Sequence, residues 1–142
     1  MVEALSPLFV AQSMFARDRA SQLLGMQIVD CEAGTATVQM KVSDDMVNGL
    51  SVCHGGFIFT LADSAFAFAC NNTNFNTVAA GCTIEFLAPV KLGDTLTARA
   101  AERAQRGRTG IYDVDVTNQL GELIATFRGK SARIGGHVIE PV

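Results

Sequence analysis

With 142 residues, the chain is long enough for one domain with a hydrophobic core and too short for two. Hydrophobic residues make up 49% and charged residues 18%, which excludes a disordered chain. The net charge of −3 argues against a nucleic-acid partner. The sequence has neither a membrane-spanning apolar run nor a signal-peptide pattern, so we expect no membrane association and a cytoplasmic location.

The N-terminal third predicts a helix and a hairpin. Apolar residues recur at helical spacing from Pro7 to Leu24, and Gly25 can end such a helix. Gln27 to Cys31 is a short strand candidate, and apolar and polar residues alternate cleanly from Thr35 to Val42. We expect these two strands to pair, and the following segment from Ser43 to Cys53 to be a loop.

The stretch from Asn48 to Ala69 is the one around which the rest of the chain is organised. From Phe57 to Cys70 it is apolar on all sides, with Thr60, Asp63 and Ser64 as its only polar members. A helix of this kind is buried on all sides. Asp63 must therefore be paired, be protonated or lie in a cleft. The alternative to a functional role is a buried structural carboxylate that caps a neighbouring loop.

Two glycines precede this helix. Gly55 and Gly56 lie where it begins, so their N–H groups are unsatisfied, unshielded and at the positive end of the helix dipole. Such groups can stabilise an oxyanion. Eight residues on, Asp63 returns to within roughly 40 to 80 degrees of the side on which Gly55 lies. We therefore expect a polarising donor and a carboxylate to face one cleft.

The remainder predicts strands. Asn71 to Asn76 is a polar break, and four alternating segments follow, namely Thr77 to Ala88, Thr95 to Ala101, Gly110 to Thr117 and Leu123 to Ile134. The tail from Gly135 is expected to be loosely held. We predict one α+β domain over residues 1–142, a long central helix wrapped by a curved antiparallel sheet, with an N-terminal helix. One sheet covers one side of the helix, so a second copy should cover the other in a homodimer whose sheets join edge to edge.

Cysteines and histidines are sparse. Four cysteines lie among apolar neighbours without metal-ligand spacing, and the chain has two histidines, so we expect buried free thiols and no metal site. Cys53 beside His54 could be a nucleophile pair, but adjacent side chains usually point apart. Six of the eleven basic residues fall between Arg103 and Arg133, which suits the phosphates of a nucleotide-bearing ligand or, alternatively, solvated strand faces.

Several motifs, in this order and at these spacings, carry a resemblance over nearly the whole chain, from about Phe15 to Gly136. They are Asn48, Cys53-His54-Gly55-Gly56, Leu61-Ala62-Asp63-Ser64-Ala65-Phe66-Ala67, Thr83-Ile84-Glu85-Phe86-Leu87-Ala88-Pro89, Phe127-Arg128-Gly129-Lys130-Ser131 and Arg133-Ile134-Gly135-Gly136. The sequence resembles hotdog-fold acyl-CoA thioesterases, in particular the phenylacetate-pathway type that acts on hydroxyphenylacetyl-CoA.

The resemblance implies roles for particular residues. Asp63 would be the catalytic carboxylate, Gly55 would offer its N–H to the thioester oxygen, and Asn48 would hold the carbonyl or the attacking water. His54 would position the loop or Asn48. Substrate contacts would come from Gly56, Phe66 and Ser64, with Phe66 selecting the acyl group, and the CoA phosphates would meet Arg128, Lys130 and Arg133.

The resemblance also implies an assembly. Gly55 and Asn48 of one chain would face Asp63 of the other in a homodimer with shared active sites, and two dimers would form a homotetramer. No cofactor is implied, since the CoA thioester is the substrate. Relatives often have an assisting hydroxyl where this chain has Ala67 and, on the next strand, about Ala79. Either Thr60 or Ser64 substitutes, or no hydroxyl is needed.

We therefore expect hydrolysis of an aryl- or arylacetyl-CoA to the free acid and CoA, with Asp63 as general base on water or as nucleophile. The nearest rival is a hotdog acyl-CoA hydratase or dehydratase, whose catalytic His reaches the substrate directly, whereas His54 precedes a Gly-Gly helix start. The other rival is a non-catalytic acyl-CoA-binding protein, which would more naturally carry a DNA-binding helix pair.

Overall fold

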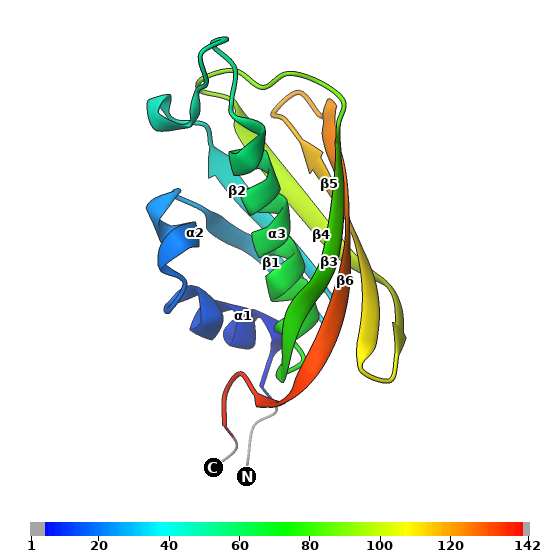
Figure 1. Ribbon diagram of the computed structural model, residues 1–142. Helices are drawn as coiled ribbons and strands as arrows, with labels where there is room; N and C mark the ends of the chain where they lie inside the picture. The colour runs from blue at the N-terminus through cyan, green and yellow to red at the C-terminus, as the bar shows by residue number, and fades with distance from the viewer. Residues whose placement is uncertain (1–4, 141–142) are drawn as a thin grey trace.

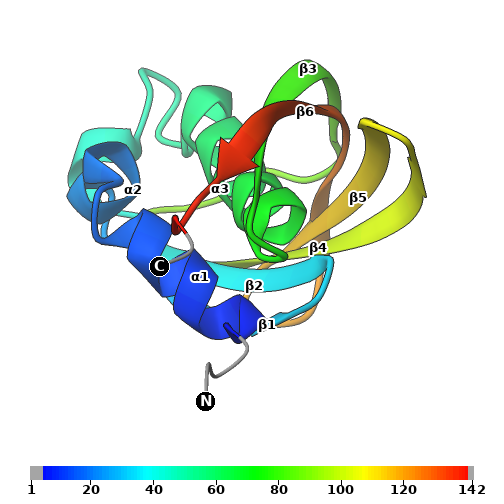
Figure 2. The same cartoon turned by 90° about the horizontal axis from the view of Figure 1, so that it is seen from below.

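A long helix lies against one face of a six-stranded antiparallel sheet in the computed structural model, which describes residues 5–140 (Figure 1). The helix is α3 (Gly55–Asn71), and the strand order is β1-β2-β4-β5-β6-β3. The strands are β1 (Gln27–Glu32), β2 (Thr35–Lys41), β3 (Phe75–Phe86), β4 (Thr95–Arg106), β5 (Thr109–Thr117) and β6 (Leu123–His137). The sheet curves around α3, as Figure 2 shows from below. This is the predicted architecture.

The core fills the space between α3 and the concave face of the sheet. Leu61, Ala65 and Phe68 of α3 are fully buried. In β2 the residues Ala36, Val38 and Met40 are buried and alternate with less buried neighbours, as the sequence pattern predicts. The same alternation runs through β5. The sheet thus covers one long side of the helix.

The sheet and the N-terminal helices bury most of α3 but leave one stripe of it partly exposed. Gly56, Thr60, Asp63 and Ala67 are spaced four, three and four residues apart, so they lie on one side of the helix, and none of them is fully buried. A short 3-10 helix (Asp44–Met46) and the loop that follows it lead to the start of α3. The uncovered stripe therefore begins beside this loop and contains Asp63.

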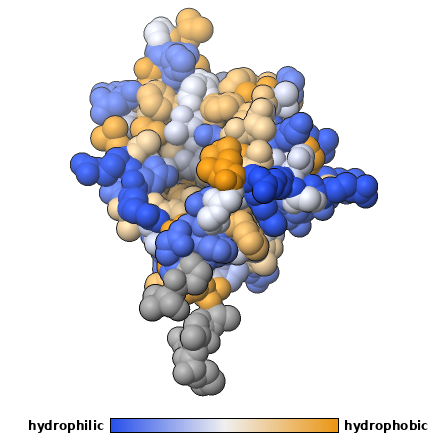
Figure 3. Space-filling view, turned by 60° about the horizontal axis from the view of Figure 1, so that its bottom comes forward, coloured by the Kyte–Doolittle hydropathy of each residue, from blue (hydrophilic) through white to orange (hydrophobic). Residues whose placement is uncertain are grey.

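β3 forms one edge of the sheet, and its outer edge has no partner strand among the described residues. Apolar side chains are exposed along this edge and on the adjoining end of β6, namely Phe75, Val78, Phe86, Leu87 and Ile134. Figure 3, which looks toward the lower end of the molecule, shows apolar residues in orange among polar ones in blue. An exposed, partly apolar edge strand is a site for pairing with another chain.

The N-terminal helix is broken, contrary to the prediction of one helix from Pro7 to Leu24. The structure has α1 (Pro7–Phe15) and α2 (Arg19–Leu23). The break occurs because Asp18 caps α2, its side chain accepting the N–H of Ser21. Gly25 follows α2 with φ +70°, in agreement with its expected role at the helix end.

The prediction of a loosely held tail from Gly135 is also wrong for the residues up to 140, which the structure describes. β6 extends to His137, beyond the predicted end at Ile134. Asn74 then holds the chain, because its Nδ2 donates to the carbonyl of Ile139 (3.0 Å) and its Oδ1 accepts the N–H of Ile139 (2.8 Å). Residues 141–142 lie outside the described range. β4 likewise continues to Arg106, past the predicted Ala101.

Candidate active site

One N–H group at the start of α3 is free to bind a ligand. His54 is the N-cap, and its Nδ1 accepts the N–H of Gly56 at 3.1 Å. The carbonyl of His54 accepts the N–H of Phe57 at 3.0 Å. Among the described residues, the N–H of Gly55 has no acceptor, so Gly55 rather than Gly56 presents the available donor at the positive end of the helix.

A cavity of about 420 Å³ adjoins this donor. Gly55 and Ile58 line it from α3, and Val52, Phe86 and Val90 from the neighbouring segments. A Cβ atom on Gly55 would lie 3.1 Å from the ring of Phe86, closer than ordinary contact. The absence of a side chain at position 55 therefore keeps the backbone N–H accessible beside Phe86, a residue that the sequence analysis gave no role of its own.

Asn48 lies in the loop before α3, where its side-chain oxygen and its side-chain amide group have different roles. Its Oδ1 accepts the N–H groups of Leu50 (2.9 Å) and Val52 (3.3 Å), which makes it a turn residue. Its Nδ2 has no acceptor within residues 5–140. The two ends of the loop are joined because the N–H of His54 donates to the carbonyl of Met46 at 2.7 Å. The loop is tied to the body of the protein because the N–H of Cys53 donates to the carbonyl of Val90 at 2.7 Å. Asn48 thus holds the loop and retains an amide donor.

Asp63 is a half-buried carboxylate without a hydrogen-bond or ion-pair partner among the described residues. Burial raises its pKa, and the negative charge of Asp18 raises it further. The carboxyl group is therefore a stronger base than an exposed one. This combination of burial, missing partner and raised pKa is typical of a functional carboxylate.

Gly55 and Asp63 of one chain do not meet. Eight residues separate them on α3, which is about 12 Å along the helix axis. A thioester carbonyl that accepts from the Gly55 N–H is therefore out of reach of the Asp63 carboxylate of the same chain. Within one chain, the two groups that the sequence analysis placed at a single cleft are thus separated along α3.

The hydroxyl groups near Asp63 are already engaged. Thr60 Oγ1 donates to the carbonyl of Gly56 at 2.8 Å. Ser64 Oγ lies 2.8 Å from Ser21 Oγ, in a buried contact with the N-terminal segment. Neither side chain is turned toward Asp63 by these contacts, and positions 67 and 79 are alanines.

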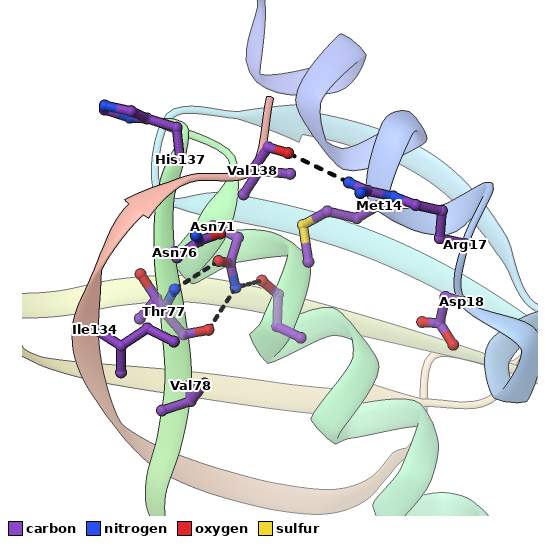
Figure 4. A pocket seen from close by; sticks show the side chains of 11 residues that line it. Met14, Arg17, Asp18, Asn71, Asn76, Thr77, Val78, Ile134, His137 and Val138 are labelled. Atoms are coloured by element: carbon purple, nitrogen blue, oxygen red, sulfur yellow. Dashed lines mark hydrogen bonds between the residues drawn. The ribbon is translucent and has the colours of Figure 1, made fainter. Parts of the chain in front are cut away.

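A larger cavity, of about 620 Å³, lies beyond Asp63 at the other end of α3 (Figure 4). Ala67, one helical turn after Asp63, opens onto it, and its apolar lining includes Met14, Val78 and Ile134. Asn71 is also part of the lining, but its amide is used internally, with Nδ2 bound to the carbonyls of Ala67 (2.9 Å) and Thr77 (3.0 Å). Arg17 reaches across the cavity to the carbonyl of Val138 at 3.3 Å.

The structure keeps Phe66 away from both cavities. It is 1% exposed and packs in the core against the rings of Tyr112 and Phe127. A Cβ on Gly129 would come within 2.7 Å of its ring, so Gly129 is the glycine that makes room for it. In this position Phe66 fixes the packing of α3 on β5 and β6.

The three basic residues expected to meet phosphates are not grouped together. Arg128 forms a two-point ion pair with Asp113 (2.7 and 3.0 Å), which raises the pKa of Arg128 and lowers that of Asp113. Lys130 is exposed and, like Arg128, alternates with the inward-facing Gly129, so both lie on the face of the sheet opposite α3. The guanidinium of Arg133 lies 4.4 Å from the centre of the Phe75 ring, at the β3 edge.

The Cys53–His54 pair has no nucleophile geometry. His54 Nδ1 faces the N–H of Gly56, and burial raises the pKa of the Cys53 thiol, so the thiolate is disfavoured. All four cysteines are free. In the part of the chain that the structure describes, no group of three or more His, Cys, Asp or Glu side chains could hold a metal ion. Nor does any helix within residues 5–140 have the length and apolar character needed to cross a membrane.

One long helix wrapped by a curved antiparallel sheet is the architecture of the hotdog-fold thioesterases. A sequence profile of the thioesterase superfamily matches residues 50–125. The acyl-coenzyme A thioesterase PaaI of Escherichia coli strain K12 is 48% identical over 128 residues, which are 90% of this chain and 91% of that protein. The chain belongs to the thioesterase superfamily, and it is a thioester hydrolase.

Solved structures agree with this assignment. The structure of the E. coli PaaI protein from the phenylacetic acid degradation operon superimposes with a TM-score of 0.92 at 47% identity, covering 94% of this chain and 98% of that one. A Streptococcus mutans UA159 protein bound to acetyl CoA gives a TM-score of 0.76 at 32% identity, with 78% and 90% coverage. The predicted fold is thereby confirmed.

Proposed function

We propose that this protein hydrolyses acyl-CoA thioesters with an arylacetyl group, such as phenylacetyl-CoA or hydroxyphenylacetyl-CoA, to the free acid and CoA. The observation that carries the proposal is the pairing of a free Gly55 N–H at the start of α3 with an unpaired Asp63 carboxylate on its uncovered side. The resemblance to the E. coli protein of phenylacetic acid degradation supports the arylacetyl class and a role in phenylacetate catabolism. The acetyl-CoA complex of a relative supports CoA as the carrier.

In the proposed reaction the Gly55 N–H stabilises the charge that develops on the thioester oxygen. Asp63 takes a proton from a water molecule, the hydroxide attacks the carbonyl carbon, and the C–S bond breaks so that the CoA thiolate leaves and is protonated. On the second route Asp63 itself attacks the carbonyl carbon, the C–S bond breaks as the CoA thiolate leaves, and water hydrolyses the resulting anhydride. The raised pKa of Asp63 makes it both a stronger base and a stronger nucleophile, so it agrees with either route.

The site is proposed to lie between two copies of the chain. About 12 Å separates Gly55 from Asp63 along one helix, so Asn48 and Gly55 of one chain would act with Asp63 of the other. The open, partly apolar edge of β3 is where two sheets would join. Two such dimers would form the homotetramer. A stable monomer of about 15 kDa in sedimentation experiments would contradict this assembly.

The cavity beside Ala67 is proposed to hold the acyl group, since it opens one helical turn from Asp63 and its walls at Met14, Val78 and Ile134 are apolar. Phosphate contacts are assigned to Lys130 and Arg133, because Asp113 already neutralises Arg128. CoA is substrate rather than cofactor, and no other cofactor is proposed. We assign the protein to the cytoplasm, where its four free cysteines would remain reduced.

Thiol release from a panel of CoA thioesters tests the proposal. The panel contains acetyl-, long-chain acyl-, benzoyl-, phenylacetyl- and ring-hydroxylated phenylacetyl-CoA, and it compares the wild type with Asp63→Asn. We expect the highest kcat/KM for arylacetyl-CoA and a loss of at least about 10²-fold in the variant, with acyl-CoA binding retained. Thiol release that does not depend on Asp63, or hydration of an enoyl-CoA in its place, would contradict the proposal.

A further inference from the structure

Three polar side chains join the turn between α1 and α2 to α3, next to Asp63. Asp18 Oδ1 accepts the N–H of Ser21 at 2.9 Å, and Asp18 Oδ2 accepts the Ser21 hydroxyl at 2.6 Å. Ser21 Oγ also lies 2.8 Å from Ser64 Oγ. Since the single proton of the Ser21 hydroxyl is given to Asp18, Ser64 is the donor in the second contact. A directed chain of hydrogen bonds thus runs from α3 to the Asp18 carboxylate.

This chain of hydrogen bonds is buried and lies next to Asp63 in the sequence of α3. Ser21 is 1% exposed and Ser64 8% exposed, so water does not compete for their hydroxyls. Ser64 follows Asp63 directly in α3, and the contact fixes the rotation of the helix at this point. Asp18 also lines the cavity that opens at Ala67 (Figure 4). The Asp18 carboxylate therefore faces the same region of the molecule as Asp63.

The charges around Asp63 can be named element by element. From the α1–α2 turn, Asp18 acts on it with a negative charge. From α3 and β3, the thiols of Cys70 and Cys82 interact with it, and burial raises the pKa of both, that of Cys70 to about 12. These thiols are uncharged near neutral pH. In the proposed dimer, His54 of the partner subunit would also approach Asp63.

We propose that Asp18 is a positioning residue of the active site, which holds α3 through Ser21 and Ser64 and sets a second negative charge beside Asp63. The proposal rests on the catalytic role given to Asp63 in the proposed function. Its consequence is that Asp63 is a better proton acceptor than burial alone would make it, because a neighbouring negative charge disfavours the ionised form. This role needs no contact between Asp18 and the substrate.

The variant Asp18→Asn removes the charge and keeps the side chains connected, because the amide Nδ2 that replaces Oδ2 can donate to Ser21 Oγ, which can then donate to Ser64 Oγ. Asparagine is as good an N-cap as aspartate, and its oxygen still accepts the N–H at position 21, so α2 remains capped. The negative charge is lost. Because Asp63 then ionises more readily, we expect the acid limb of the pH profile of kcat/KM to shift to lower pH. In ¹³C NMR titrations, the Asp63 carboxyl, assigned with the Asp63→Asn spectrum, should show a lower pKa than in the wild type.

Ser21→Ala is the matched control. It keeps the Asp18 charge and the N–H at position 21, but it breaks the contact with Ser64. We expect a lower melting temperature and a lower kcat at every pH, with the acid limb in its wild-type position. If Asp18→Asn behaves in the same way as Ser21→Ala, lowering activity without moving the limb, Asp18 has a merely structural role and the proposal is overturned.

The two proposals fail in different ways. Thiol release that survives in Asp63→Asn would remove the catalytic role of Asp63, and with it the present proposal. Hydrolysis that depends on Asp63, combined with an Asp63 pKa unchanged by Asp18→Asn in the NMR titration, would leave the proposed function intact and overturn the role of Asp18 alone.

Discussion

At the scale of single residues, Asp63 is held in a position that disfavours its own charge. Burial, with a contribution from Asp18, raises its pKa. The folded protein therefore binds this proton more tightly than the unfolded chain. As a result, stability decreases as pH rises from the ordinary carboxyl pKa through the raised one, and the full penalty is present above it. A residue kept at such a cost is expected to serve activity rather than folding.

We therefore expect Asp63→Asn to unfold at a higher temperature than the wild type at neutral pH. The difference should shrink as pH is lowered toward the ordinary carboxyl range, because the wild-type carboxyl is then protonated. Calorimetry across this pH range measures it. Asp30→Asn, at an exposed position in β1, is the control and should show no change. A lower melting temperature for Asp63→Asn at neutral pH would mean that the carboxylate makes a stabilising contact.

Gly55 is the residue at which added volume should affect catalysis. In Gly55→Ala the new methyl group meets the Phe86 ring at 3.1 Å, so the ring or the start of α3 must shift. Removal of one oxyanion donor typically lowers kcat by 10²–10³-fold. In Gly55→Ala the donor is displaced rather than removed, so we expect kcat to fall by about tenfold or more. Gly49→Ala in the same loop meets nothing within 4 Å and should retain wild-type kcat. Equal activity of both variants would exclude Gly55 as the donor.

The sequence alone made Asp63 and Gly55 candidates, because a lone carboxylate on an apolar helix and a glycine pair at a helix start are local features. Asp18 was missed as a functional residue. Its local signal was an Asp three positions before Ser21, the pattern of a helix N-cap. Its place near Asp63 depends on the contact between Ser21 and Ser64, which are 43 residues apart and cannot be paired by any local pattern.

At the scale of elements, the spacing of apolar residues predicted the central helix and the strands of the sheet. It could not predict where the N-terminal helix breaks. Apolar residues continue at helical spacing through the break. Only the capping of α2 by Asp18, and the burial of Ser21 against α3, separate α1 from α2. The extended ends of β4 and β6 were missed for a similar reason, since they depend on pairing with neighbouring strands.

The C-terminal end of α3 depends on one asparagine. Asn72 is 1% exposed, and its Nδ2 donates to the carbonyls of Glu32 and Thr35, each at 2.8 Å. Its Oδ1 accepts the N–H of Gly34 at 3.1 Å. These three bonds attach α3 to the β1–β2 turn.

We expect Asn72→Ala to lower the free energy of unfolding by about 2–4 kcal/mol, because buried backbone groups lose their partners. Asn72→Asp should be at least as destabilising at neutral pH, since a carboxylate would face two carbonyl oxygens. Thr73→Ala, at the exposed neighbouring position, should change the value by no more than about 0.5 kcal/mol. Urea unfolding measures all three. An alanine variant as stable as the Thr73 control would show that water replaces these bonds.

At the scale of the whole molecule, the structure shows which apolar surfaces a single chain does not bury. α3 is apolar on nearly all sides, yet the sheet and the N-terminal helices leave one stripe of it partly exposed, and within residues 5–140 the outer edge of β3 has no partner strand. The need for a second copy could be inferred from the sequence, because one sheet cannot surround a helix. The distance between Gly55 and Asp63 supports the proposal that two copies share their active sites.

Mixed dimers provide a test of shared sites. In Asn48→Asp the side-chain oxygen that accepts from Leu50 and Val52 is kept, while the amide donor is replaced by a negative charge. This variant and Asp63→Asn should each be nearly inactive. If they are unfolded and refolded together, random assembly gives heterodimers in about half of the molecules, and each heterodimer has one intact site out of two. We expect about a quarter of the wild-type activity to return. If each chain carried a complete site, both would remain defective after mixing and no activity would be recovered.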